Sequence, residues 1–121
     1  MASYNTVDNS CFDVDVKGLR IATLNVRGIK NLFKQSSILN SLKSFNLDIL
    51  GLQETHLILE EENNLSLAWN GPCIFAEGTN NSKGLSILFS NKFTFDQISI
   101  IFKNERILLC SAKINDEKFY F

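Results

Sequence analysis

Two apolar runs separated by one helix-length segment place the strongest constraint on the fold. Residues 19–24 and 49–52 are mostly apolar and predict buried strands. The segment 31–45 between them carries an apolar stripe at three- and four-residue spacing, made of Ile38, Leu42 and Phe45. Asn31 is the expected cap of this amphipathic helix. Strand, crossover helix and strand form a βαβ unit with parallel strands, so both carboxyl ends meet at one edge of the sheet.

A polar side chain follows each of these two strands. Asn25 closes the first and Glu54 the second. Sites in open α/β sheets lie outside the carboxyl ends of the strands, and paired carboxylate and amide oxygens suit Mg²⁺ or Mn²⁺. An Asn before Gly28 is also typical of a turn, and a Glu after a strand also caps helices or stays solvated. The spacing alone leaves both interpretations open.

Composition indicates one globular domain. The chain has 121 residues, 45% hydrophobic, with ten Phe and one Pro. No apolar run approaches the roughly 20 residues of a membrane span, and the first ten residues do not resemble a secretory signal. Three separated cysteines without a CxxC pair predict reduced thiols. We therefore expect an intracellular protein, nuclear or cytoplasmic, without membrane contact.

The charges are unevenly distributed although the net charge is only −1. Residues 17–43 include six basic side chains and no acidic one, whereas residues 44–82 include six acidic side chains and no basic one. A basic block beside an acidic one would place phosphate contacts next to a cation site. A solvated helix face is the alternative for Lys34 and Lys43.

Turn signals divide the rest of the chain. Residues 1–16 predict a flexible lead-in and residues 17–121 a single domain. A short helix is expected at 60–69, and strands at 73–76, 85–89, 95–102, 106–114 and 118–121, with a tight turn at Asn104. A chain that stops on Phe119, Tyr120 and Phe121 leaves an aromatic strand edge. We expect either a fragment or a sheet completed by a partner at this edge.

Three motifs in unbroken order carry a family resemblance. Residues 21–28, 48–56 and 84–89 resemble the amino-terminal motifs of the endonuclease/exonuclease/phosphatase superfamily. Within it, the QETH ending at 53–56 and the stretch 75–84 are most similar to the endonuclease domains of LINE-type non-LTR retrotransposons. The resemblance implies a four-layer α/β sandwich with mixed sheets, of which this chain supplies the amino-terminal half.

The same resemblance implies hydrolysis of DNA phosphodiesters with Mg²⁺ or Mn²⁺. Glu54 would bind the metal, and Asn25 would join it and position metal-bound water or the scissile phosphate. The family's catalytic His belongs to a later Ser-Asp-His motif, so His56 is expected to contact substrate or orient Glu54. Substrate phosphates are also expected to meet Arg27 and the polar loop that includes Asn80, Asn81 and Lys83, although solvated loop polarity also explains the two asparagines. Trp69, Phe75 and Phe89 are assigned to core packing rather than to base stacking.

The chain lacks the later motifs of the family, an active-site Tyr, an Asp-x-Asn pair and Ser-Asp-His. We therefore expect a truncated chain without measurable nuclease activity, an expectation that Mg²⁺-dependent nicking abolished by Glu54→Gln would contradict. A second hypothesis is a non-catalytic remnant or interaction module that docks through its open strand edge. Related phosphoesterases, namely abasic-site endonucleases, phosphoinositide phosphatases and sphingomyelinases, remain alternatives.

Overall fold

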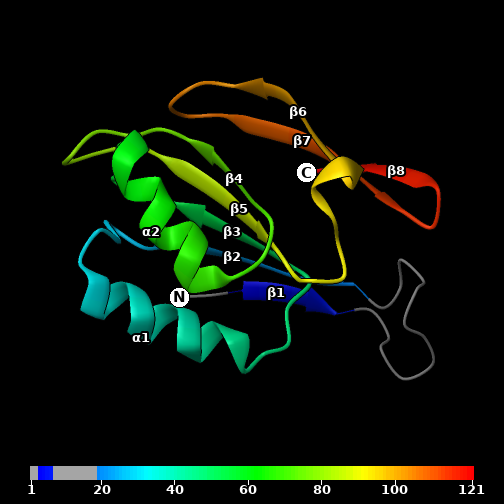
Figure 1. The fold of residues 1–121 in the computed structure, drawn as a ribbon, viewed down its shortest axis with the longest axis horizontal. Helices are drawn as coiled ribbons and strands as arrows, with labels where there is room; N and C mark the ends of the chain where they lie inside the picture. The colour runs from blue at the N-terminus through cyan, green and yellow to red at the C-terminus, as the bar shows by residue number, and fades with distance from the viewer. Residues whose placement is uncertain (1–2, 7–18) are drawn as a thin grey trace.

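A computed structural model describes residues 3–6 and 19–121, which form two α-helices and two sheets (Figure 1). The helices are α1 (Leu32–Lys43) and α2 (Leu59–Trp69), and a short 3-10 helix is η2 (Phe95–Gln97). The strands are β1 (Ser3–Thr6), β2 (Arg20–Asn25), β3 (Ile49–Gln53), β4 (Cys73–Ala76), β5 (Leu85–Phe89), β6 (Ile98–Lys103), β7 (Leu108–Ile114) and β8 (Glu117–Tyr120).

Sheet A is mixed and has the strand order β1-β2-β3-β5-β4. Strands β2 and β3 are parallel, with Ile21 opposite Ile49 and Asn25 opposite Gln53, while the other pairs are antiparallel. Sheet B consists of β6, β7 and β8, all antiparallel. The predicted α/β class, the βαβ unit and the mixed sheet are confirmed.

Helix α1 begins as predicted but ends earlier. The Asn31 side-chain oxygen accepts hydrogen bonds from the backbone N–H groups of Phe33 and Lys34, both at 3.0 Å. The buried residues of the helix are Gln35, Leu39 and Leu42. Phe45 follows the end of α1 and is 42% exposed, so its prediction as part of the apolar stripe is wrong.

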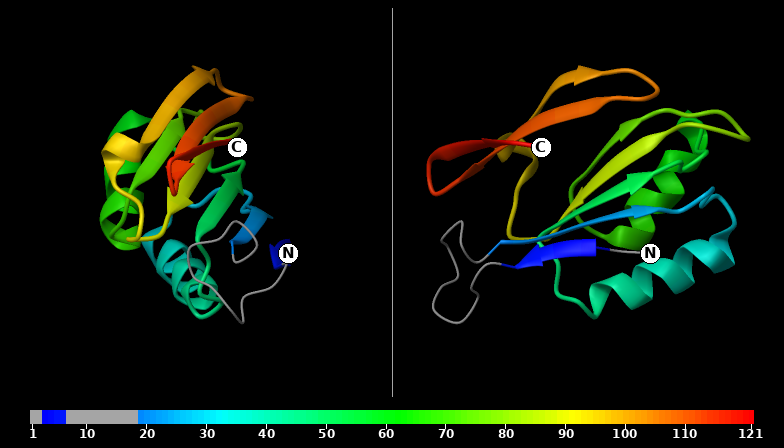
Figure 2. Two further views of the ribbon diagram at one scale, coloured as in Figure 1. Left: turned by 90° about the vertical axis from the view of Figure 1, so that its right-hand side faces the viewer. Right: turned by 180° about the vertical axis from the view of Figure 1, so that it is seen from behind.

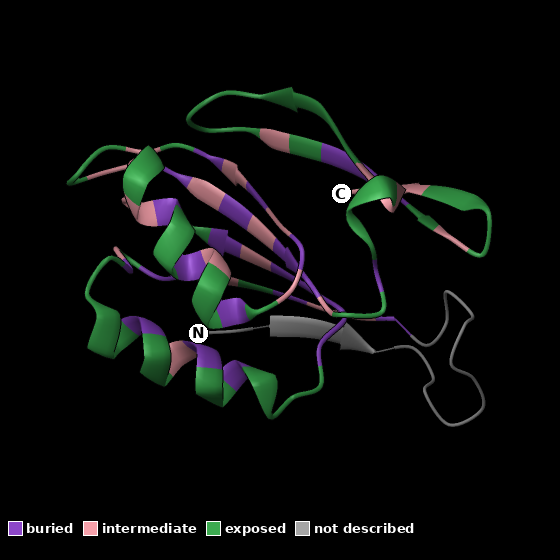
Figure 3. Ribbon diagram, viewed as in Figure 1, coloured by how far each residue is buried: buried purple, intermediate pink, exposed green. Residues whose placement is uncertain are grey.

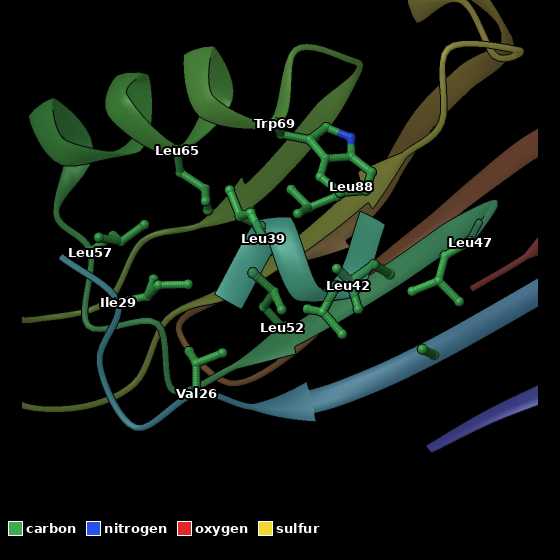
Figure 4. Packing of buried hydrophobic residues seen from close by; sticks show 12 residues of the cluster. Val26, Ile29, Leu39, Leu42, Leu47, Leu52, Leu57, Leu65, Trp69 and Leu88 are labelled. Carbon is green, nitrogen blue, oxygen red and sulfur yellow. The ribbon is translucent and has the colours of Figure 1, made fainter. Parts of the chain in front are cut away.

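The core has two layers, one on each face of sheet A. On one face, Leu39, Leu65 and Trp69 of the helices point toward Leu52 and Leu88 (Figure 4). The other face packs against sheet B, through a cluster that comprises Ile49, Ile74, Phe89, Phe93, Cys110 and Ala112. Figure 2 shows this order of helices, sheet A and sheet B.

The three aromatic side chains assigned to the core lie there. Trp69 and Phe89 are buried, and Phe75 is partly buried against the helix-side cluster. Each fully buried side chain of this size contributes about 1.5–3 kcal/mol of transfer free energy. The prediction of core packing is confirmed.

Strand positions agree with the sequence for β4 and β5 and shift in the two strands that follow. The expected strand at 95–102 opens with η2, because the Gln97 side chain accepts a bond from the Thr94 N–H and closes a 3-10 turn. Arg106 and Ile107 belong to the predicted turn rather than to β7, since their N–H groups donate to the Asn104 side-chain oxygen.

Strands near both ends of the chain pair with a neighbouring strand. Most of the lead-in predicted for residues 1–16 lies outside the described residues, but Ser3–Thr6 forms β1 and pairs with β2, so these four residues are not unstructured. At the other end, β8 pairs with β7, and Phe121 exchanges two backbone hydrogen bonds with Cys110. No described strand pairs with the outer edge of β8.

Neither described α-helix is long and apolar enough to cross a membrane.

Candidate active site at the ends of β2 and β3

The parallel pairing of β2 and β3 brings Asn25 and Glu54 into contact. Asn25 Nδ2 donates a hydrogen bond of 2.5 Å to Glu54 Oε2, and Asn25 Oδ1 accepts one of 3.1 Å from the Arg27 N–H. The Glu54 side chain remains 51% exposed. The expected meeting of the two strand ends is confirmed, and it leaves a carboxylate that is held by an amide yet open to solvent.

The backbone bends sharply at this edge. Arg27, Glu54 and His56 have positive φ angles of 50°, 54° and 58°. Non-glycine residues in this left-handed region are uncommon, persist where surrounding contacts enforce them, and concentrate at functional sites. The Glu54 carbonyl accepts a bond of 2.7 Å from the Gly28 N–H, and the His56 N–H donates at 2.9 Å to the Lys83 carbonyl. Two loops that are distant in sequence, at Gly28 and at Lys83, therefore hold the turn that carries Glu54.

Two glycines make close contacts with this turn. A β-carbon at Gly28, whose φ is +88°, would lie 2.8 Å from His56 Nδ1. A β-carbon at Gly84, whose φ is +94°, would collide with Thr55 Oγ1. Both positions therefore require glycine for conformation and for space. Both residues belong to motifs of the sequence, but these contacts depend on loops that meet in three dimensions and have no signal in the sequence.

His56 lies beside Glu54, with Nε2 at 3.9 Å from Glu54 Oε1. Its side chain is only 17% exposed. Together with Asn25, the imidazole flanks the carboxylate, so the structure brings three of the predicted site residues together.

The remaining predicted site residues belong to the loops that follow β2 and β4. The Arg27 side chain is exposed, and Asn81 is exposed in the β4–β5 loop. Lys83 Nζ forms an ion pair of 2.8 Å with Glu105 Oε1, and this hydrogen bond lowers the pKa of Glu105. The predicted contacts of these three side chains with substrate stay predictions.

Two lysines of the acid-free stretch connect loops at the same edge. Lys34 Nζ donates at 2.9 Å to the Val26 carbonyl, and Lys30 Nζ donates at 3.3 Å to Asn80 Oδ1. Lys34 is therefore more than the solvated helix residue weighed in the sequence analysis. The uneven charge pattern was the signal for both lysines, but it did not identify their partners.

Comparison with known proteins places this geometry in a family. Residues 22–120 match the model of the Endonuclease/Exonuclease/phosphatase family. The chain belongs to this family. It is also 36% identical over 81 residues to an uncharacterized 149 kDa protein of transposon TX1 from Xenopus laevis, a match that covers 67% of this chain and 6% of that protein. The transposon relative supports the predicted resemblance to retrotransposon endonuclease domains.

Solved structures agree with the family fold. An AP endonuclease from Archaeoglobus fulgidus has a TM-score of 0.57 and 24% identity, over 84% of this chain and 39% of that chain. A humanized D. rerio TDP2 has a TM-score of 0.55 and 23% identity, over 84% of this chain and 44% of that chain. D. rerio TDP2 complexed with a single-strand DNA product has a TM-score of 0.54 and 24% identity, over 84% of this chain and 43% of that chain. The chain thus spans less than half of each of these structures and a small part of the transposon protein.

The donor set of this family member suits a cation that takes few protein ligands. Glu54 offers an exposed carboxylate, and Asn25 an amide oxygen with one further lone pair. The described residues contain no group of three or more His, Cys, Asp and Glu side chains that could hold a metal. Mg²⁺ keeps several waters and is commonly bound through one or two carboxylates, so two oxygen ligands fit it better than zinc.

The two described cysteines have surroundings that suppress thiol reactivity. Cys73 and Cys110 are free thiols, in agreement with the prediction for the described cysteines, and Cys11 lies outside the described residues. Burial raises the pKa of Cys73 to about 12 and that of Cys110 to about 11. Both thiols therefore stay protonated at neutral pH and are poor nucleophiles.

Proposed function

We propose that Asn25 and Glu54 belong to a site that hydrolyses DNA phosphodiesters with the help of a divalent cation, as in an endonuclease of retroelement type, and that this chain supplies the cation-binding part of that site without being active by itself. The observation that carries the proposal is the Asn25–Glu54 pair, an exposed carboxylate fixed by an amide at the shared edge of two parallel strands. Membership of a family of nucleases and phosphatases supports phosphodiester chemistry. The printed names of the neighbours, an AP endonuclease and a TDP2 with a DNA product, favour DNA as the substrate.

Glu54 and Asn25 would hold Mg²⁺ or Mn²⁺. When bound, such an ion stabilises the negative charge that develops on phosphate oxygens and on the leaving alkoxide. The chain's own part is to orient the Glu54 carboxylate, because the Asn25 amide donates to Oε2 while Arg27 N–H fixes the other end of that amide. Oε1 is left for the cation.

Arg27, Asn81 and Lys83 are proposed to position the DNA backbone. Arginine and small polar side chains supply most contacts to phosphate oxygens, and the exposed Arg27 lies two residues from Asn25. Lys83 would have to release Glu105 to reach a phosphate. An enzyme with this substrate would act inside the cell, in the nucleus or cytoplasm.

Metal-dependent DNA binding tests the proposal. Fluorescence anisotropy of a labelled DNA duplex is measured with and without Mn²⁺ for the wild type, Glu54→Gln and the control Glu117→Gln, which removes an exposed carboxylate of β8. We expect Mn²⁺ to strengthen DNA binding by the wild type and by the control but not by Glu54→Gln. Equal binding by all three proteins at every Mn²⁺ concentration would refute the proposal.

The Arg27 contribution has its own readout. Arg27→Ala should weaken binding by a similar factor for all DNA sequences and lower the slope of log affinity against log salt by about 1, because a phosphate contact releases roughly one counterion. An unchanged slope would remove Arg27 from the proposed DNA contacts.

A second candidate, an interaction module, is favoured by the open edge of sheet B. The outer edge of β8 has no partner among the described strands, and Tyr120 is 63% exposed. A partner that adds a strand near Phe119 and Phe121 would pair with this edge. Binding of such a partner would be unaffected by Glu54→Gln, which separates the two candidates.

A further inference from the structure

We infer that His56 is a positioning residue for Glu54, packed against Gly28, and that its buried Nε2 serves the carboxylate rather than substrate. The sequence leaves both roles open for this histidine. The inference rests on the proposed function in one respect, namely that Glu54 binds the cation.

The Nε2 atom of His56 is shielded from solvent. Nε2 is buried and has no hydrogen-bond partner within the described part of the chain. Nδ1 faces Gly28 so closely that a β-carbon there would lie 2.8 Å away. A nitrogen that contacts a phosphate or transfers a proton to substrate must be accessible to it, and Nε2 is not accessible.

The buried nitrogen is directed at the carboxylate. Nε2 lies 3.9 Å from Glu54 Oε1, too far for a hydrogen bond but close enough for electrostatic attraction. Asn25 Nδ2 meets the other oxygen, Oε2. The carboxylate is therefore flanked on two sides by nitrogen groups, and its remaining side is open to solvent.

The backbone supports this placement of the imidazole. The His56 N–H donates to the Lys83 carbonyl at 2.9 Å, and the Gly28 N–H donates to the Glu54 carbonyl at 2.7 Å. The loop that binds the Glu54 backbone is thus the same loop that supports the His56 ring. Any side chain at position 28 would displace the imidazole from Glu54.

A carboxylate that is held in one orientation binds a cation better than a freely rotating one. Groups that orient a metal ligand, without touching the metal, typically change affinity or activity 10- to 100-fold. His56 has the position of such a group, since it approaches Glu54 from the protein side.

The first test needs no metal. His56 is the only histidine of the chain, so its imidazole signals in a long-range ¹H–¹⁵N NMR spectrum are assigned without ambiguity. We expect Glu54→Gln to shift the Nε2 signal and the control Glu117→Gln to leave it unchanged. An Nε2 signal that Glu54→Gln does not move would overturn the inference, whether or not the protein binds cations.

The second test measures Mn²⁺ affinity by isothermal titration. His56→Ala should weaken binding about tenfold, and His56→Gln, which can still present an N–H group, should recover part of the loss. Gly28→Ala should also weaken binding, and the Gly28→Ala/His56→Ala double variant should bind no more weakly than the weaker single variant, because both changes act through one contact.

The substrate-contact role predicts a different pattern. It would leave Mn²⁺ affinity unchanged in His56→Ala while DNA binding falls in the absence of metal, and this result would overturn the inference. A wild type that binds no Mn²⁺ would refute the proposed function alone, and the metal-free NMR comparison would still decide the contact.

Discussion

The two ends of β3 carry carboxylates with opposite surroundings. Asp48 precedes the strand and is buried. Its carboxylate accepts a hydrogen bond of 2.8 Å from the Arg20 N–H and forms an ion pair of 2.6 Å with Lys92. Glu54 follows the strand, is half exposed, and is flanked by Asn25 and His56. The same strand therefore ends in a fully paired carboxylate on one side and an incompletely paired one on the other.

The difference separates stability from function. A buried carboxylate with a cation and a backbone donor is costly to remove, because its partners lose their bonds. An exposed carboxylate contributes little to stability, and its free oxygen remains available to a ligand. We therefore assign Asp48 to the fold, and the open oxygen of Glu54 is consistent with its proposed role as a ligand of the cation.

The largest effect on stability is expected from removing the paired carboxylate of Asp48. Asp48→Ala leaves Arg20 N–H and Lys92 without this acceptor, so the free energy of unfolding should fall by about 2–3 kcal/mol. Urea unfolding measures it, and Glu54→Ala is the control, with an expected change within about 0.5 kcal/mol. Equal losses in both variants would remove the distinction between the two ends.

The next effect concerns the backbone of the open end. Gly84→Ala should destabilise by about 2 kcal/mol, because the residue has a φ of +94° and its β-carbon would collide with Thr55. Gly51→Ala in β3 is the matched control, since its β-carbon would meet Thr23 Cγ2 at an ordinary 3.5 Å. If the two variants unfold at the same urea concentration, the close contact at Gly84 has no energetic importance.

Glu62 provides a third environment, buried like Asp48 but facing another carboxylate. Burial, and to a lesser extent the charge of Glu77, raises its pKa to about 7, while Lys103 opposes the shift. Between pH 4.5 and 7 the unfolded carboxyl group ionises while the folded one keeps its proton, so stability falls as pH rises.

Glu62→Gln removes this pH dependence. At pH 8 we expect the free energy of unfolding of Glu62→Gln, relative to the wild type, to be about 1 kcal/mol higher than the same difference at pH 4.5. The exposed Glu60→Gln, in the same helical turn, should show no such change. Parallel pH profiles for wild type and Glu62→Gln would contradict this assignment.

The regular elements of sheet A were predictable because their signals are local. The Asn31 cap, the parallel β2–β3 pair and the bounds of β4 and β5 follow from periodicity and turn residues within a few positions. Local pattern failed where the partner is distant, as at Phe45 beyond the end of α1. It also failed at Ser3–Thr6, whose pairing with β2 has no short-range signal.

The contact between Asn25 and Glu54 was predictable, but the surroundings of that pair were not. Asn25 and Glu54 could be identified because a βαβ unit must bring their strand ends together. The left-handed turns at Glu54 and His56, the seat of the imidazole on Gly28 and the Lys83–Glu105 ion pair depend on loops that approach from distant segments. No spacing in the sequence encodes these contacts.

The exposed surface of sheet B shows the same limit. Turn signals predicted strands there, yet β6 is exposed along almost its whole length (Figure 3). The sequence identified the strands but not the face that each side chain would occupy.

Paramagnetic broadening by Mn²⁺ tests the central claim most directly. In ¹H–¹⁵N spectra of the wild type, trace Mn²⁺ should broaden the amide signals of Asn25, Glu54 and Gly28 and leave those of Asp48 and Ser90, at the other end of sheet A, sharp. Glu54→Gln should abolish the broadening. Broadening centred on Asp48, or unchanged broadening in Glu54→Gln, would contradict the assignment of the metal site to the carboxyl ends of β2 and β3.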